Sequence, residues 1–103
     1  MNTEDELNNQ VYNDSAEQVI ELGNRLSEAE PGADLYDISD GLLAGAVQYW
    51  LYARTPCDNK NCTDCESINT AEKRLQELLR FAEELSRNSE YYHSPNDANA
   101  GRA

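Results

Sequence analysis

Three cysteines are the residues of this chain whose type and spacing come closest to a chemical site. Cys57, Cys62 and Cys65 follow a C-x4-C-x2-C pattern, and thiolates this close in sequence can hold zinc if a fourth ligand is supplied. The only histidine, His93, follows Cys65 by 28 residues, and a straight helix of that length would place it about 40 Å away. We therefore expect no metal and no cofactor, and we interpret residues 56–66 as a loop with reduced thiols.

Two alternatives for the cysteines stay open. In the first, Asp58 or Asp64 serves as the fourth zinc ligand. In the second, Cys62 and Cys65 act as a redox pair, although the negative charge of Asp64 and Glu66 opposes the thiolate that such a pair requires.

Other residue combinations do not indicate catalysis. Ser94 follows His93 directly, so the two cannot supply the oriented nucleophile, base and third group of a triad. Carboxylate pairs such as Glu83 and Glu84 are common in a chain with 20 acidic residues, and they are typical of a solvated helix face. The five glycines are scattered and form no phosphate-binding loop. We expect that the protein is not an enzyme.

The charge of the chain is strongly negative and unevenly distributed. The 103 residues contain 8 Lys+Arg and 20 Asp+Glu, which gives a net charge of −12. Residues 1–53 hold eleven acidic residues against Arg25 alone, a net charge of −10. Phosphate backbones repel such a surface, so we expect no direct binding to nucleic acid. No basic, apolar leader is present at the N-terminus, and the longest apolar stretch is too short to span a bilayer, so we expect a cytoplasmic location.

Apolar periodicity predicts an all-α fold, a three-helix domain over residues 14–93. A capping box at Ser15 predicts the start of the first helix, Asp34 or Asp37 can cap the second, and Asn69 can cap the third. The polar segment before Ser15 and the segment after His93 have little to bury. The sequence therefore predicts a flexible acidic N-terminal arm at residues 1–13 and a disordered C-terminal tail at residues 94–103. Between them it predicts three helices at residues 15–30, 35–54 and 68–92, of which the third is long.

The second helix carries more apolar surface than a small core can cover. Tyr49, Trp50 and Tyr52 occupy adjoining positions about 100° apart, so they cannot all point inward. Trp and Tyr dominate the centres of protein interfaces. We interpret part of this surface, together with one aromatic residue of the third helix, as a protein-binding site formed by Leu43, Val47, Trp50, Leu51 and Phe81.

The third helix has heptad spacing, and the second contains two glycines four residues apart. Steps of three and four residues connect a seam that contains Leu75, Leu78, Leu85 and Tyr92. Such a seam, above a slim core, predicts a homodimer. Gly41 and Gly45 lower helix propensity, and a neighbouring helix that approaches closely would explain their presence.

The segments from Gly41 to Arg54 and from Tyr91 to Asp97, with the cysteine loop between them, resemble small acidic quorum-sensing anti-activators of pseudomonads. The likeness lies in size, charge and helical pattern over about two-thirds of the chain, and no defining motif allows a functional residue to be carried over. The resemblance implies a protein that binds a LuxR-type transcription factor at its ligand-binding domain, blocks its dimerisation and prevents DNA binding. The alternative is an acidic DNA mimic, whose carboxylates occupy the basic groove of a nucleic-acid-binding protein.

Overall fold

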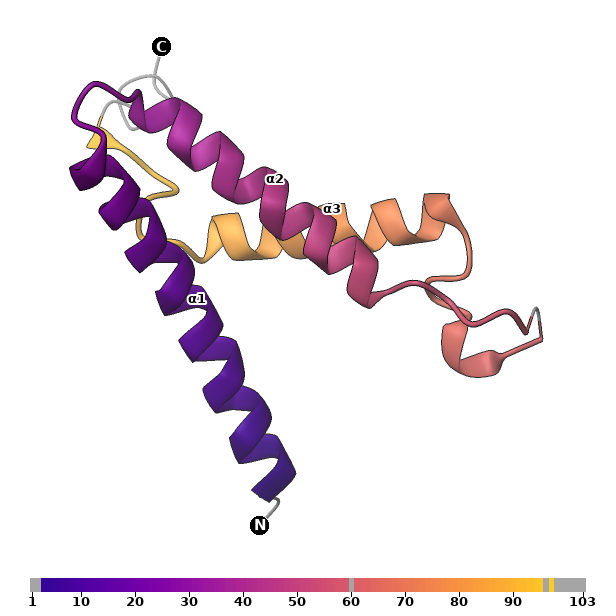
Figure 1. Ribbon diagram of the computed structural model, residues 1–103. Coiled ribbons are helices and arrows are strands. Elements are labelled where there is room, and N and C mark those ends of the chain that lie inside the picture. Colours follow the sequence, from indigo (N-terminus) through magenta and orange to yellow (C-terminus); the bar gives the residue numbers. More distant parts are fainter. Residues whose placement is uncertain (1–2, 60, 96, 98–103) are drawn as a thin grey trace. The chain divides into compact units, whose positions relative to one another are not determined.

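Within the residues that the structure describes, the chain forms three α-helices and one short 3-10 helix (Figure 1). The computed structural model describes residues 3–59, 61–95 and 97, and no strand occurs within these ranges. The predicted all-α class with three helices is confirmed. The elements in chain order are α1 (Thr3–Ala29), α2 (Leu35–Ala53), η1 (Thr63–Cys65) and α3 (Ala71–Arg87).

The chain divides into two compact units, residues 1–50 and 51–103, and the boundary falls within the last turn of α2. Across the described ranges, no helix combines the length and apolar character needed to cross a membrane. No residue in these ranges is buried. Large apolar side chains are exposed in both units, among them Leu43 in the first and Leu75 in the second.

The first unit begins with α1, which starts twelve residues earlier than expected. The prediction of a helix from Ser15 preceded by an arm at 1–13 is wrong for residues 3–13, which are helical. Glu4, Asp5 and Glu6 lie in the first turn, where negative charge is favourable near the positive end of the helix dipole. No proline or glycine interrupts the segment before Gly23. Ser15 is therefore an interior helical residue and caps nothing.

α2 has the bounds that its local signals predict. The Asp34 side chain accepts a hydrogen bond from the Tyr36 N–H at 2.9 Å, and the Asp34 carbonyl accepts from the Ile38 N–H at 3.1 Å. This is the geometry of an N-cap residue. The helix ends at Ala53, and the N–H groups of Arg54 and Thr55 bond three residues back before Pro56. The expected range of 35–54 is correct to one residue.

α1 and α2 contact each other at Gly23. A Cβ atom added to Gly23 would lie 3.0 Å from Cδ1 of Leu42, so the missing side chain makes room for Leu42. The expectation of a close approach at Gly41 and Gly45 is wrong, since a Cβ at either position meets nothing within 4 Å. The close contact in this unit therefore lies on α1, and the Leu42 side of α2 is the side that faces it.

The second unit contains α3, whose predicted bounds and cap were both wrong. The N-cap is Thr70, whose hydroxyl accepts a hydrogen bond from the Lys73 N–H at 3.1 Å, and not Asn69. The helix ends at Arg87 with Asn88 as C-cap, so α3 has 17 residues and is the shortest of the three helices. The expected range of 68–92 is too long at both ends.

The chain turns sharply after α3 because short polar side chains bind the backbone there. The Ser89 hydroxyl accepts a hydrogen bond from the Tyr91 N–H at 3.1 Å, and the Ser89 carbonyl accepts from the Tyr92 N–H at 3.1 Å. Such bonds compete with helix propagation. Further on, the Ser94 N–H and hydroxyl both donate to the Asp97 carboxylate. Of the predicted tail at 94–103, residue 96 and residues 98–103 lie outside the described residues.

Candidate functional site

The first candidate site is an apolar face of α2. Because successive helical residues are about 100° apart, four of the predicted binding residues fall within about 100° of the helix circumference. These are Leu43, Val47, Trp50 and Leu51. Tyr36 lies two turns before Leu43 on the same side, and sequence reasoning missed it although the seven-residue spacing was visible. We call this set of five residues the Leu43 face.

The exposure of the Leu43 face varies along the helix. Tyr36 is 79% exposed and Leu43 63% exposed, whereas Val47 and Trp50 are half-buried. The indole Nε1 of Trp50 is shielded from solvent. Leu43 is about 100° from Leu42 around the helix, and Leu42 is the residue that contacts Gly23 of α1. The α1 contact therefore lies to one side of the Leu43 face, and the N-terminal part of that face is open to solvent.

The fifth predicted binding residue and the predicted dimer seam lie on or near α3. Phe81 and Leu78 are half-buried, while Leu75 and Leu85 are 51% and 47% exposed. Tyr92 lies beyond the end of α3 at Arg87, so its predicted place in the helical seam is wrong. Its ring lies 5.9 Å from the Arg87 guanidinium carbon and packs edge-on against His93 with ring centroids 4.8 Å apart. The helical part of the seam is therefore limited to Leu75, Leu78 and Leu85.

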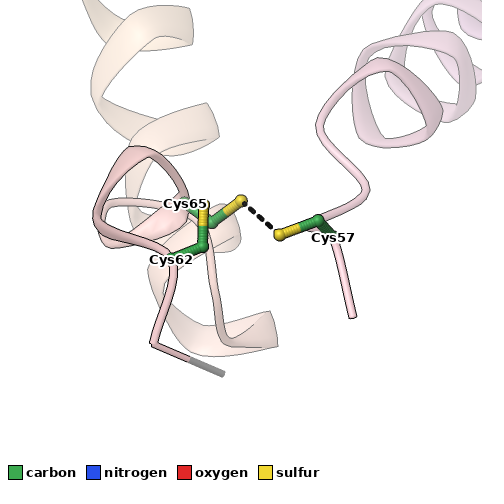
Figure 2. A group of neighbouring side chains, drawn as sticks. All are labelled: Cys57, Cys62 and Cys65. Atoms are coloured by element: carbon green, nitrogen blue, oxygen red, sulfur yellow. Dashed lines mark hydrogen bonds between the residues drawn. The ribbon is translucent and has the colours of Figure 1, made fainter. Parts of the chain in front are cut away.

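The second candidate site is the cluster of cysteines, which the structure brings together. The Sγ atoms of Cys57, Cys62 and Cys65 all lie within 4.8 Å of one another. Figure 2 shows Cys62 and Cys65 on one turn of the chain and Cys57 reaching toward them from the segment that follows α2. The Cys65 thiol donates to Cys57 Sγ at 3.6 Å, and the Cys57 thiol makes a long contact with the Asn59 carbonyl at 3.8 Å. The three thiols thus form one group.

The turns at residue 59 and over residues 61–68 explain this convergence. The N–H of Cys65 bonds to the carbonyl of Cys62, and the N–H of Glu66 bonds to that of Thr63. Cys62 is the N-cap of η1 and Cys65 is its last residue, so one short turn carries both thiols. The Asn59 side chain accepts from the Asn61 N–H at 3.0 Å, which turns the chain between Cys57 and Cys62.

The thiols differ in acidity. Hydrogen bonds from the thiols of Cys57 and Cys65, and from the backbone N–H groups of Cys65 and Asp64, lower the pKa of Cys62. At Cys65, the Cys57 N–H favours the thiolate, but the thiols of Cys62 and Cys57 and partial burial outweigh it and raise the pKa. Cys62 is therefore the first of these two residues to lose its proton.

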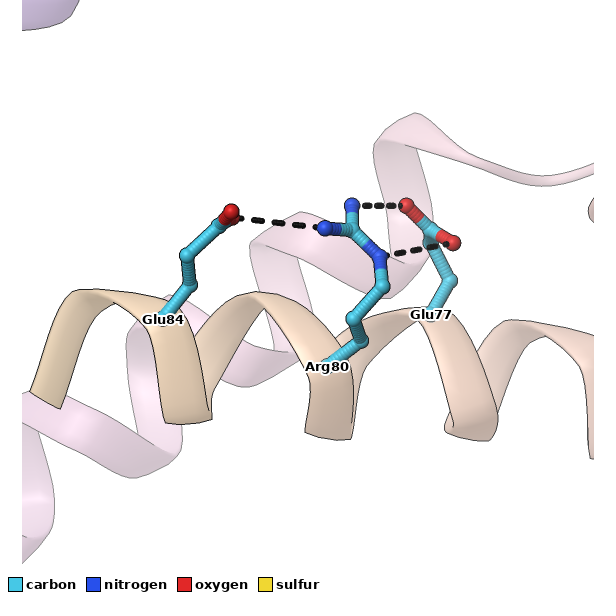
Figure 3. A network of polar contacts seen from close by, with 3 residues as sticks. All are labelled: Glu77, Arg80 and Glu84. Carbon is cyan, nitrogen blue, oxygen red and sulfur yellow. Dashed lines mark hydrogen bonds and ion pairs between the residues drawn. The ribbon is translucent and has the colours of Figure 1, made fainter. Parts of the chain in front are cut away.

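The exposed side of α3 is a polar surface held by ion pairs. Figure 3 shows the Arg80 guanidinium between two carboxylates, with Nη2 at 2.6 Å from Glu77 Oε1 and Nη1 at 3.3 Å from Glu84 Oε2. Arg87 pairs with Glu83 at 2.8 Å in the same way. The hydrogen bond from Arg80 lowers the pKa of Glu77. These pairs are one helical turn apart and are a solvated helix face, as the sequence predicts for Glu83 and Glu84.

Comparison with protein-family models, with curated proteins and with solved structures finds no match to this chain.

Proposed function

We propose that this chain is a non-enzymatic anti-activator that binds a LuxR-type transcription factor at its ligand-binding domain and blocks its dimerisation. The observation that supports this proposal most is the Leu43 face, an apolar and aromatic surface in a chain whose described residues include none that is buried. Exposed apolar and aromatic side chains on one helix face, as at Tyr36 and Leu43, are typical of sites of protein association. The resemblance to the pseudomonad anti-activator QslA supplies the class of partner.

In this proposal the Leu43 face supplies the binding affinity, and the acidic charge increases the association rate. Burial of one large aromatic or aliphatic anchor at the centre of an interface contributes about 2 kcal/mol or more. The net charge of −10 in residues 1–53 acts at longer range and accelerates encounter with a basic partner. A DNA mimic reverses these roles, because its carboxylates carry the affinity.

The direct test mixes the purified chain with a dimeric LuxR-type regulator, with its isolated ligand-binding domain and with its operator DNA. We expect a complex with the isolated domain, loss of regulator dimers in size-exclusion chromatography with light scattering, and release of the operator in a gel-shift assay. Binding to the DNA-binding domain alone, with no complex at the ligand-binding domain, would contradict the proposal and support the DNA mimic.

We further propose that the free protein is a homodimer joined through α3. Leu75 and Leu85 lie ten residues apart, nearly three turns, on one side of this helix, and both are about half exposed. A second copy would cover them. Sedimentation at micromolar concentration is expected to give a dimer that Leu85→Glu converts to a folded monomer. The matched control is Gln76→Glu, which adds a charge at an exposed position on the opposite side of the helix from Leu85. A wild-type monomer excludes this assembly.

A further inference from the structure

We propose that Cys57, Cys62 and Cys65 form a three-thiolate binding site for a zinc ion, whose fourth position is taken by water. This site is independent of the proposed partner binding and goes beyond it. The sequence favours a metal-free loop because a fourth Cys or His is lacking, but it does not predict the geometry of the three thiols. The geometry points to a site that is already assembled in space.

The distances between the sulfur atoms fit a metal. A tetrahedral zinc ion with Zn–S bonds near 2.3 Å holds its thiolates about 3.8 Å apart. The Sγ atoms of Cys57 and Cys65 are 3.6 Å apart, and all three lie within 4.8 Å of one another. The largest separation is therefore within about 1 Å of the required value, and side-chain rotation alone can close that gap. A disulfide needs a distance near 2.0 Å and would leave the third thiol out.

The backbone positions the three ligands before any ion binds. Cys62 and Cys65 lie at the two ends of one short turn, which is the C-x2-C arrangement of many zinc sites. The N–H of Cys65 bonds to the Cys62 carbonyl at 3.3 Å, and the N–H of Cys62 bonds to the Asn59 carbonyl at 3.1 Å. These backbone bonds fix the positions of Cys62 and Cys65 without an ion.

The charge around the cluster also favours a divalent cation. Asp58, Asp64 and Glu66 are close in sequence to the cysteines, and three thiolates beside them would repel one another without a cation. A zinc ion removes this repulsion. Within the described part of the chain, no carboxylate or imidazole joins the three sulfur atoms. The fourth position therefore falls to water, as in zinc sites that keep one position open.

The site is connected to the start of α3. The Lys73 ammonium donates to the Glu66 carbonyl at 2.9 Å, and the Arg74 guanidinium donates to the Ile68 carbonyl at 2.8 Å. Both carbonyls belong to the segment that leads from Cys65 into the helix. An ion that fixes Cys62 and Cys65 therefore also holds the segment that caps α3, and metal binding should stabilise the second unit.

The test uses the full chain, purified under reducing conditions and stripped with a chelator, with Co²⁺ as the spectroscopic probe. We expect one Co²⁺ per chain, with thiolate-to-metal charge-transfer bands and the intense visible bands of tetrahedral cobalt. Zinc should displace cobalt, raise the thermal midpoint and be present at one equivalent in protein purified without chelator. Each of Cys57→Ser, Cys62→Ser and Cys65→Ser should weaken binding at least tenfold.

Two matched controls sharpen this test. Asp58→Asn removes a carboxylate of the same loop that is outside the sulfur cluster, and it should leave the cobalt spectrum intact. His93→Ala should do the same, since His93 is not a ligand; a changed spectrum would overturn the assignment of water to the fourth position. Absence of cobalt bands and of any zinc effect on the thermal midpoint would overturn the site itself. So would a native protein whose mass shows a disulfide in place of bound metal.

Discussion

The two units of this protein differ in net charge and in the polar contacts of their side chains. Residues 1–50 hold eleven acidic residues against one arginine, and their helices expose large apolar side chains such as Leu7, Ile20 and Leu43. Residues 51–103 are nearly balanced in charge, and α3 carries three ion pairs, a side-chain N-cap and two further side-chain bonds to the preceding loop. The first unit therefore combines a strongly acidic surface with exposed apolar side chains. The second has local contacts that stabilise it from within the chain.

The largest effect should come from placing a charge on the open part of the Leu43 face. Leu43→Asp should weaken binding to the ligand-binding domain about thirtyfold or more, because it buries a carboxylate where an apolar anchor is needed. Neutralisation of Glu17 and Glu21 together should change the equilibrium much less and mainly slow association. Calorimetric titration measures both effects, and circular dichroism checks that the helices are intact. If the charge-neutral variant failed to bind while Leu43→Asp bound fully, the affinity would come from the acidic residues and not from the Leu43 face.

Trp50→Ala and Val47→Asp are less direct variants, even though sequence reasoning favours them. Both residues are half-buried, so their replacement disturbs the fold and the binding face together. A substitution at Leu43 tests binding with little effect on the fold, because this side chain is 63% exposed. The structure therefore changes which residue is the best probe of the same surface.

The sequence predicts an element well where a local signal ends it. Asp34 and Pro56 bracket α2, and its observed bounds agree with the prediction to one residue. The start of α1 carries no such signal, since Ser15 and the residues after it fit a capping box that the longer helix overrides. The heptad pattern also continues past the true end of α3, because apolar spacing does not show that the Ser89 hydroxyl binds the Tyr91 N–H.

The two candidate sites also differ in how much of each could be predicted from the sequence. The face of α2 follows from helical spacing alone, so four of its five residues were predicted. The cysteine cluster depends on turns at Asn59 and Cys62 that place Cys57 next to Cys65. The spacing of the cysteines in the sequence shows only that they could lie close together. The hydrogen bonds of the turns bring them together.

A pair of alanine variants tests the helix starts. Thr70→Ala removes the N-cap of α3 and should lower the free energy of unfolding by about 1 kcal/mol. Ser15→Ala lies inside α1 and should raise helix stability by a few tenths of a kcal/mol, because alanine is the better helix former. Thermal melts followed by circular dichroism measure both changes. An equal loss for the two variants would indicate that α1 does begin at Ser15.

A pair of glycine variants tests where α1 and α2 meet. Gly41→Ala adds a methyl group into open space and should stabilise the protein by up to about 1 kcal/mol. Gly23→Ala gains the same helix propensity but forces Leu42 to move, so its net gain should be smaller or absent. Chemical denaturation of both variants gives the comparison. A larger gain for Gly23→Ala would show that the two helices do not touch there.

The smallest effect concerns the ion pairs of α3. Because Arg80 lowers the pKa of Glu77, the folded state binds that proton less readily than the unfolded state. The stabilisation is therefore present above the ordinary Glu value near 4.5 and is lost as the pH falls through the lowered pKa. The loss of helicity between pH 7 and pH 3, measured by circular dichroism, should be smaller in Arg80→Gln than in the wild type. Identical acid responses would show that the pair contributes nothing.

The measurement that tests the central claim most directly is a calorimetric titration of the full chain into an isolated LuxR-type ligand-binding domain at low and high salt. Apolar contacts survive screening, whereas charge-driven mimicry weakens steeply as the Debye length falls below about 10 Å. We predict a complex whose dissociation constant changes little between the two conditions, together with a negative heat-capacity change from apolar burial. A complex that forms at low salt and is lost at high salt, or no complex at all, would contradict the account.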